Sequence, residues 1–298
     1  RLLGDILRFT REAPALLEAP GGAHVTLGDF LDDRRFGEEF TGHYLLPMAS
    51  AIWSASLDAI RSFPAVTLVR FFDNHGLLSL WSQPTWKVVD GGSHSYIPAL
   101  SALFKDRIAL DASVDKVTRG ERGVTITFHD RPSRTFDEVV IACHGDQVLP
   151  LLADPTGAER DVFGRFTTTS NIVYLHTDTS FLPSRARARA SWNYLLGGGE
   201  GTPPTVTYDL NRLQGLQTRE QYCVTLNPRE PIDDSRVLRR MVYRHPLYDR
   251  QATLAQQRWA EVSGVSRTHY CGAYWGYGFH EDGLNSAIRV ARTLGVTW

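Results

Sequence analysis

Apolar and polar residues follow two different periods along this chain, and the change of period divides it into helical and strand-rich stretches. Residues 1–107 follow mainly the helical period. Thr26 predicts the N-cap of one helix, Pro64 the start of another, and Ser93 the cap of a third. The apolar face of this third helix is expected to consist of Ile97, Leu100, Leu103 and Phe104.

The period shortens to two residues after position 107, as in half-buried strands. Residues 108–117 and 124–128 both alternate apolar and polar side chains, and 119–123 predicts the turn between them. Residues 139–142 form a continuous apolar run, which fits a strand covered on both faces in a parallel sheet. The chain is therefore expected to change from helix to sheet near residue 108.

The rest of the chain predicts mostly strands, followed by one strand–turn–helix unit. The strands expected here are 172–176, 191–195, 206–209, 222–226 and 241–244. A helix around 250–262 leads to a short strand at 269–271 and a glycine-rich turn at 272–283. The final helix is expected to carry Leu284, Ala287, Ile288 and Ala291 on one face.

Composition narrows the class of protein. A length of 298 residues favours two domains, and 42% hydrophobic residues provide ample material for a core. The net charge of −1 argues against nucleic-acid binding. The three cysteines include no C-x-x-C pair, which predicts no disulfide framework or zinc site and favours a reducing cytoplasm. No apolar stretch approaches the length of a membrane span, so we expect no integral membrane segment.

The glycine-rich segment between the last strand and the last helix is the strongest candidate for chemistry. Glycines allow a ligand to approach the backbone closely, and the surrounding aromatic residues offer flat apolar surface. The helix N–H groups around Gly283, Leu284 and Asn285 would favour an anion or an electron-rich ring oxygen. The alternative is purely structural: a tight turn with Asp282 as N-cap and the aromatic residues packed in the core.

A second candidate follows the apolar strand at 139–142, where the chain reads Cys143-His144-Gly145-Asp146. Ligands of open α/β sheets lie beyond the carboxyl ends of the strands, although this could equally be a simple strand-to-helix turn. A further reading makes Cys143 the nucleophile of a hydrolase, which predicts inactivation by iodoacetamide. The chain has no G-x-G-x-x-G motif and no spaced cluster of metal ligands.

Several of these segments together resemble a known superfamily. They are residues 86–93, 176–178, 190–194, 222–228 and 270–283. They are similar to the flavin-containing amine oxidoreductases, and most of all to a bacterial branch of predicted NAD/FAD-binding proteins often encoded beside cyclopropane-fatty-acid synthase. The resemblance implies FAD as cofactor and an α/β fold. A Rossmann-like FAD-binding domain would accompany an α+β substrate domain that has a mixed sheet and helices.

The resemblance also implies an interleaved domain organisation. Residues 1–107 would be the mainly helical part of the substrate domain, 108–153 an FAD-binding segment, 154–262 the substrate-domain sheet, and 263–298 the C-terminal FAD-binding segment. The implied cofactor contacts are Val114, Gly272, Ala273, Asp282, Gly283 and Leu284. The implied substrate-lining residues are Trp86, Trp192, Tyr194, Tyr274 and Trp275.

The sequence departs from the family pattern in three places. Ala273 stands after Gly272 where amine oxidases carry an acidic residue, and Lys87 is only a weak counterpart of their lysine near flavin N5. The initial βαβ unit with its G-x-G-x-x-G motif is missing, so the chain resembles an N-terminally truncated member that starts beyond this unit.

Two functions follow from the resemblance and its departures. The first is an FAD-dependent oxidoreductase that transfers a hydride from a C–H or C–N bond of a small or lipid-like substrate to flavin N5. The second is a non-catalytic accessory protein that binds a lipid or a partner methyltransferase, which the missing lysine and the missing βαβ unit favour. The first predicts bound flavin that a substrate reduces, and the second predicts that no substrate reduces bound flavin.

Overall fold

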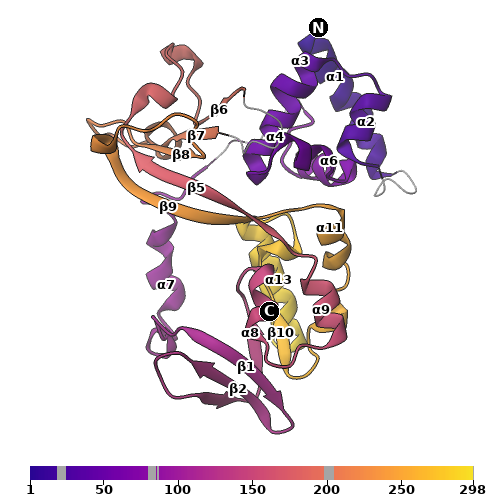
Figure 1. Cartoon of the computed structure of the whole chain (residues 1–298), viewed down its shortest axis with the longest axis vertical. Coiled ribbons are helices and arrows are strands. Elements are labelled where there is room, and N and C mark those ends of the chain that lie inside the picture. The colour runs from indigo at the N-terminus through magenta and orange to yellow at the C-terminus, as the bar shows by residue number, and fades with distance from the viewer. Residues whose placement is uncertain (19–24, 80–84, 86, 198–204, 298) are drawn as a thin grey trace. The chain divides into compact units, whose positions relative to one another are not determined.

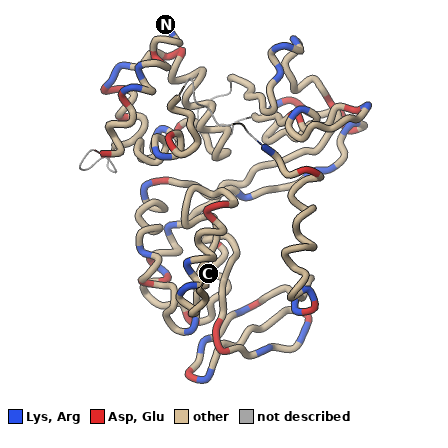
Figure 2. Tube along the Cα trace, turned by 180° about the vertical axis from the view of Figure 1, so that it is seen from behind, with Lys and Arg blue, Asp and Glu red and all other residues tan. Residues whose placement is uncertain are grey.

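The structure, a computed structural model, divides into two compact units that interleave along the chain. It describes residues 1–18, 25–79, 85, 87–197 and 205–297. The first unit comprises Arg1–Leu100 and Thr169–His245, and the second comprises Ser101–Thr168 and Pro246–Trp298 (Figure 1). Positive and negative side chains both occur in each unit (Figure 2).

The first unit begins with short helices around an aromatic core. These helices are α1 (Leu2–Glu12), α2 (Leu27–Asp33), α3 (Glu38–Phe40), α4 (Leu46–Trp53), α5 (Leu57–Arg61) and α6 (Ala65–Asn74). As predicted, Thr26 caps α2, since its hydroxyl oxygen accepts the Asp29 amide at 3.1 Å, and Pro64 directly precedes α6. The ring centroids of Phe9 and Phe40 lie 5.5 Å apart, and the helices pack around aromatic contacts of this kind.

A five-stranded sheet completes the first unit. Its strands, in the order β6-β7-β8-β5-β9, are β6 (Trp192–Leu195), β7 (Thr205–Asp209), β8 (Cys223–Leu226), β5 (Thr168–His176) and β9 (Val237–Pro246). Each prediction made for this part of the sequence coincides with one of these strands. Between β7 and β8 lies α10 (Leu210–Gln214). The side chain of His176 is fully buried in this sheet, where its Nε2 lies 2.7 Å from the Thr225 hydroxyl.

The second unit contains two small sheets. An antiparallel sheet consists of β1 (Val114–Gly120), β2 (Gly123–Phe128) and β3 (Arg134–Phe136), and β3 is a strand that the sequence pattern did not reveal. The strand predicted at 108–117 was too long, because only its second half pairs with β2.

The other sheet of this unit is parallel. It pairs β4 (Val139–Ile141) with β10 (Thr268–Tyr270), which confirms the parallel pairing predicted for 139–142. The expectation that this strand is covered on both faces is wrong. The helices of this unit are α8 (Val148–Leu151), α9 (Gly157–Phe163), α11 (Arg250–Gln256), α12 (Trp259–Val262) and α13 (His280–Thr293). Among the described strands, β10 is the one neighbour of β4. Val140 of β4 is 43% exposed, and its register partner His269 on β10 is buried.

The helix predicted after Ser93 is the clearest error of the sequence interpretation. Residues Ser93–Tyr96 form a 3-10 turn, and the α-helix that follows, α7 (Ile97–Ser101), is only five residues long. Its expected buried face is exposed, reaching 65% for Leu100 and 96% for Leu103. A helix this short presents little more than one turn, so its apolar spacing does not by itself secure a packing partner.

Among the described residues, no helix is long and apolar enough to cross a membrane.

Candidate functional site

The two glycine-containing turns singled out in the sequence meet at the carboxyl ends of β4 and β10. The two strands are parallel, and the Cys271 amide donates to the Ile141 carbonyl oxygen at 3.1 Å, so both turns leave the sheet at the same edge. A Cβ on Gly272 would lie 3.5 Å from the Cys143 carbonyl oxygen. This edge is where ligands of parallel α/β sheets bind.

Gly272 has a conformation and a setting that only glycine accommodates. Its φ is +149°, and a Cβ would lie 2.5 Å from the ring of Tyr274. Its amide donates to the Ser286 hydroxyl at 2.8 Å, and that hydroxyl donates to the Gly283 carbonyl oxygen at 2.7 Å. The end of β10 is therefore fixed to the first turns of α13.

Two residues that the sequence interpretation missed hold this turn. Gln256 in α11 donates through Nε2 to the carbonyl oxygens of Tyr274 at 2.9 Å and Gly276 at 2.6 Å. Ser286 makes the link to Gly272 just described. The position of Ser286 three residues after Gly283 was a usable signal, because serine often bonds back to the preceding helical turn. Nothing in the sequence around Gln256 indicated its role.

Helix α13 begins earlier than predicted, which changes the groups it offers to a ligand. Asp282 is not the N-cap; it lies in the first turn, where its carboxylate accepts the Phe279 amide at 3.0 Å. The Gly283 amide, expected to be free for a ligand, donates to the Phe279 carbonyl oxygen at 3.1 Å. Glu281 and Asp282 place negative charge at the positive end of the helix dipole, so this end favours a neutral ring over a diphosphate.

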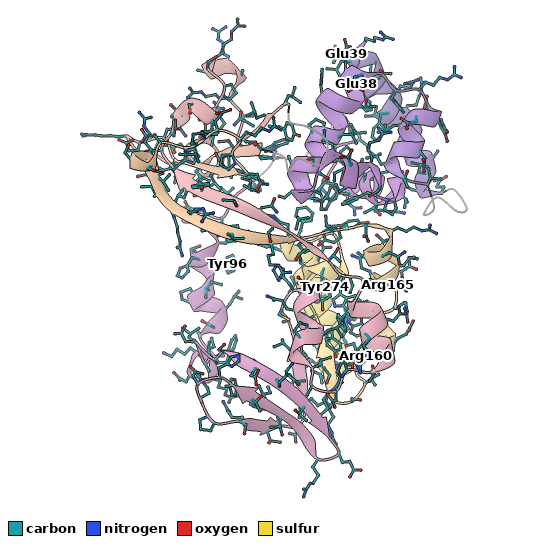
Figure 3. The ribbon with its side chains drawn as sticks, viewed as in Figure 1. Glu38, Glu39, Tyr96, Arg160, Arg165 and Tyr274 are labelled. Atoms are coloured by element: carbon teal, nitrogen blue, oxygen red, sulfur yellow. The ribbon has the colours of Figure 1, made fainter. Side chains whose placement is uncertain are left out.

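The aromatic side chains of the turn are packed in the core of the second unit. Tyr274 is 3% and Trp275 is 8% exposed, and their ring centroids lie 4.9 Å and 5.2 Å from that of Phe166. Figure 3 shows Tyr274 in the interior of this unit. This is the packing that the purely structural interpretation of the motif expected.

Buried polar atoms in this core lack hydrogen bonds. The hydroxyls of Tyr248 and Tyr274 and the Trp275 indole nitrogen have no partner of acceptable geometry among the described residues. Burial raises the pKa of both tyrosines far above the usual range, and the Trp275 indole N–H, as a poorly aligned donor to the Tyr274 oxygen, lowers the pKa of Tyr274 in part. Each such atom typically costs about 1–3 kcal/mol, so the turn has hydrogen-bonding capacity that the protein does not use.

The other predicted site residues are distributed over both units. Val114 starts β1 and packs partly against the core of the second unit. Trp192 and Tyr194 lie on β6 in the first unit, and Trp86 lies outside the described residues. Leu284 is 53% exposed on α13, close in sequence to Gly283. The structure thus brings together the C-terminal members of the predicted set.

Among the described residues, predicted site residues line a cavity in each unit. A cavity of about 480 Å³ in the second unit is lined by Trp275, Gly276, Asp282, Asn285, Ser286, Ile288, Arg289 and Arg292. A cavity of about 340 Å³ in the first unit is lined by Ser180, Phe181, Leu182, Pro183, Asn193, Tyr194, Leu195, Thr205 and Glu230. Both volumes fall in the range of small-molecule sites, and Trp192 lines neither.

The cysteine next to the β4 turn does not have the properties of a nucleophile. Burial raises the pKa of the Cys143 thiol, and its Sγ donates to the His144 carbonyl oxygen at 3.4 Å. A reactive cysteine needs the opposite shift, so this geometry argues against the hydrolase reading. Within the described ranges, no three His, Cys, Asp or Glu side chains are grouped as metal ligands would be.

Comparison with a model of the flavin-containing amine oxidoreductases gives a match over residues 7–239, well over half of the chain. The chain belongs to this family. Family membership confirms the expected flavoprotein class: an FAD-dependent oxidoreductase. The match ends before the glycine-rich turn at 272–283, so the role of that turn rests on its geometry.

Solved structures share the fold at low sequence identity. The chain is similar to cyclohexylamine oxidase from Brevibacterium oxydans, at 13% identity and a TM-score of 0.67 over 98% of this chain and 76% of that one. A putrescine oxidase variant gives 13% identity and a TM-score of 0.68, over 98% and 74%. A fatty acid isomerase from P. acnes gives 15% and 0.56, over 93% and 74%. No curated protein has a matching sequence.

The described residues fit one end of an FAD molecule better than the other. Glycines at close approach, buried aromatic rings and unpaired donors suit a flat ring system with acceptor atoms. The acidic first turn of α13 does not suit a diphosphate.

Proposed function

We propose that this protein transfers a hydride from a C–H or C–N bond of a small, partly apolar substrate to flavin N5. The observation that carries the proposal is the meeting of two glycine-containing turns at the carboxyl ends of β4 and β10, where the buried Tyr274 hydroxyl proton has no acceptor among the described residues. Val114, Gly272, Ala273, Asp282, Gly283 and Leu284 are the proposed cofactor contacts. The three free cysteines favour action in the cytoplasm.

Flavin, when bound, accepts the hydride and passes its electrons to oxygen or another acceptor. The residues of this chain would position the ring and keep water away from it. Gly272 and Ala273 would let the backbone approach one edge of the ring. Tyr274 and Trp275 would supply apolar surface that excludes water.

The cavity beside Tyr194 supports a substrate with an aliphatic portion. Phe181, Leu182 and Leu195 contribute apolar wall, and the polar side chains of Asn193 and Thr205 are engaged within the protein. A fatty acid isomerase is among the proteins of similar fold, which adds weight to a lipid-like substrate. We propose Trp86, Trp192, Tyr194, Tyr274 and Trp275 as substrate-lining residues, and a functional link to cyclopropane-fatty-acid synthase.

Anaerobic reduction of the bound flavin tests this proposal. Protein reconstituted with FAD would be mixed with alkylamines, fatty alcohols and unsaturated fatty acids while the flavin absorbance is recorded. We expect at least one class to bleach the flavin and air to restore it. Photoreduction without substrate serves as the control that the bound flavin is redox-competent.

The alternative, an accessory protein without redox chemistry, is favoured by one observation. The three lysines of the chain are Lys87, Lys105 and Lys116, and none lies in the glycine-rich turn or in α13. Bound flavin that light reduces but no substrate class reduces would favour the accessory role. Protein that takes up no FAD under any refolding condition would contradict the oxidoreductase proposal for this chain.

A further inference from the structure

The side chain of Tyr274 occupies the position at which the two turns meet. A Cβ on Gly145, after β4, would lie 3.0 Å from Cδ2 of this ring, and one on Gly272, after β10, would lie 2.5 Å from Cε1. The ring therefore touches the backbone that follows both strands. The thiols of Cys143 and Cys271, one from each strand end, are close enough to raise the pKa of its hydroxyl, although burial is the larger cause.

The Tyr274 hydroxyl proton has no hydrogen-bond acceptor among the described residues, whereas buried hydroxyls in folded proteins normally have one. It is covered from solvent and makes no hydrogen bond of acceptable geometry among the described residues. Phe166 and Trp275 enclose the ring, and the indole N–H of Trp275 approaches the hydroxyl oxygen as a donor and lowers its pKa. Neither neighbour supplies a strong acceptor, so the hydroxyl proton remains without a partner among the described residues. A phenylalanine would fill the same space without this cost.

Tyr270, four residues earlier in the chain, shows the usual arrangement of a buried tyrosine, whose hydroxyl has a hydrogen-bond acceptor. It is also fully buried, but its hydroxyl donates to the Glu159 carboxylate at 2.5 Å. The two tyrosines differ in direction: Tyr270 points to a buried acceptor of the protein, and Tyr274 lies against the edge at which a ligand would bind. The same substitution at the two positions should therefore have opposite consequences.

We propose that the Tyr274 hydroxyl is a cofactor-contacting group, whose proton lacks an acceptor in the cofactor-free protein and is donated to an acceptor atom of the bound flavin. This inference rests on the proposed function. Because the oxygen is covered in the cofactor-free protein, flavin binding has to displace part of its cover. Tyr274 thereby carries an unmet hydrogen bond that only the loaded protein satisfies.

The substitution Tyr274→Phe, with Tyr270→Phe as its matched control, tests the inference. Thermal melting of each protein without flavin would be followed by titration with FAD, monitored by tryptophan and flavin fluorescence. We expect Tyr274→Phe to melt about 2–4 °C higher than wild type, since it removes a buried hydroxyl whose proton has no acceptor. We expect its dissociation constant for FAD to rise about tenfold, which corresponds to about 1.4 kcal/mol.

The control should change in the opposite sense. Tyr270→Phe should melt lower than wild type, because the Glu159 carboxylate loses a donor, while its affinity for FAD stays that of wild type. A Tyr274→Phe protein that melts at or below the wild-type temperature would show that the hydroxyl is already paired, and so overturn the inference. Higher melting with unchanged FAD affinity would overturn it too. Wild-type protein that takes up no FAD would instead overturn the proposed function together with this inference.

Discussion

Breaking the buried ion pair between Arg119 and Glu159 should lower the free energy of unfolding of the second unit far more than breaking an ion pair on its surface. The Arg119 side chain is 3% exposed and that of Glu159 is 1% exposed. The carboxylate accepts hydrogen bonds from the two terminal guanidinium nitrogens, the Tyr270 hydroxyl and the Thr156 amide, the last at 2.7 Å. The pair joins β1, α9 and β10, so the unit proposed to hold the cofactor depends on it.

The magnitude follows from what each substitution leaves behind. In Glu159→Gln the shape is retained, but the Arg119 charge remains buried with only Asp154, which is 45% exposed, as its anionic partner. Removing one member of a buried pair costs about 3–5 kcal/mol, and Arg119→Met should fall in the same range. Replacing both members removes the uncompensated charge, so the double variant should lose far less than the sum of the single losses.

Chemical denaturation monitored by circular dichroism measures these free energies of unfolding. The matched control is Glu261→Gln, which breaks the solvent-exposed pair with Arg258 at 2.7 Å in the same unit and should change stability far less. Additivity of Arg119→Met and Glu159→Gln within about 0.5 kcal/mol would refute the reasoning, because it would show that the two charges do not interact.

The pair also predicts the response of the second unit to acid. Burial alone would raise the pKa of Glu159, but its hydrogen bonds from Arg119, Tyr270 and Thr156 outweigh burial and hold the pKa below its usual value. Its contribution to stability is therefore complete above the unfolded pKa of about 4.3 and is lost as pH falls through the lower folded value. Glu159→Gln should lack this part of the acid transition.

Three further predictions concern single positions. Gly272→Ala should lower the melting temperature and prevent flavin uptake, because the added Cβ combines backbone strain with a clash against the Tyr274 ring. Gly295→Ala is its control: with a φ of +83° and no atom within 4 Å of its Cβ position, it introduces backbone strain without a clash. Cys143 should react with iodoacetamide more slowly than a free thiol at pH 8, measured by mass spectrometry, because burial raises its pKa. Burial lowers the pKa of His176, so the unfolding free energy of wild type should fall as pH drops below about 6.5, a dependence that His176→Gln should lose.

Local signals in the sequence predicted local structure well. Thr26 and Pro64 mark helix starts because capping and the missing proline N–H act within one turn. The strands were also predicted from a local signal, because side chains of a strand point alternately to its two faces and so give an apolar–polar period of two residues. The start of α13 was misplaced because Asp282 can cap from the first turn as well as from the N-cap position.

Features that depend on distant contacts could not be read from the sequence. Arg119 and Glu159 are 40 positions apart, and no local pattern links them. Gln256 reaches the Tyr274 carbonyl from another helix, and β3 is too short to show a period. For the candidate site, the sequence located both turns, and the structure added that they meet at one sheet edge and that Tyr274 lies between them.

Hydrogen–deuterium exchange with and without FAD tests the central claim most directly, namely that the turns after β4 and β10 hold the flavin. Binding should slow exchange in peptides that cover 142–146 and 271–284, and leave the helices of residues 1–74 unchanged. Slowed exchange confined to other parts of the chain, in a protein that demonstrably retains FAD, would contradict the account.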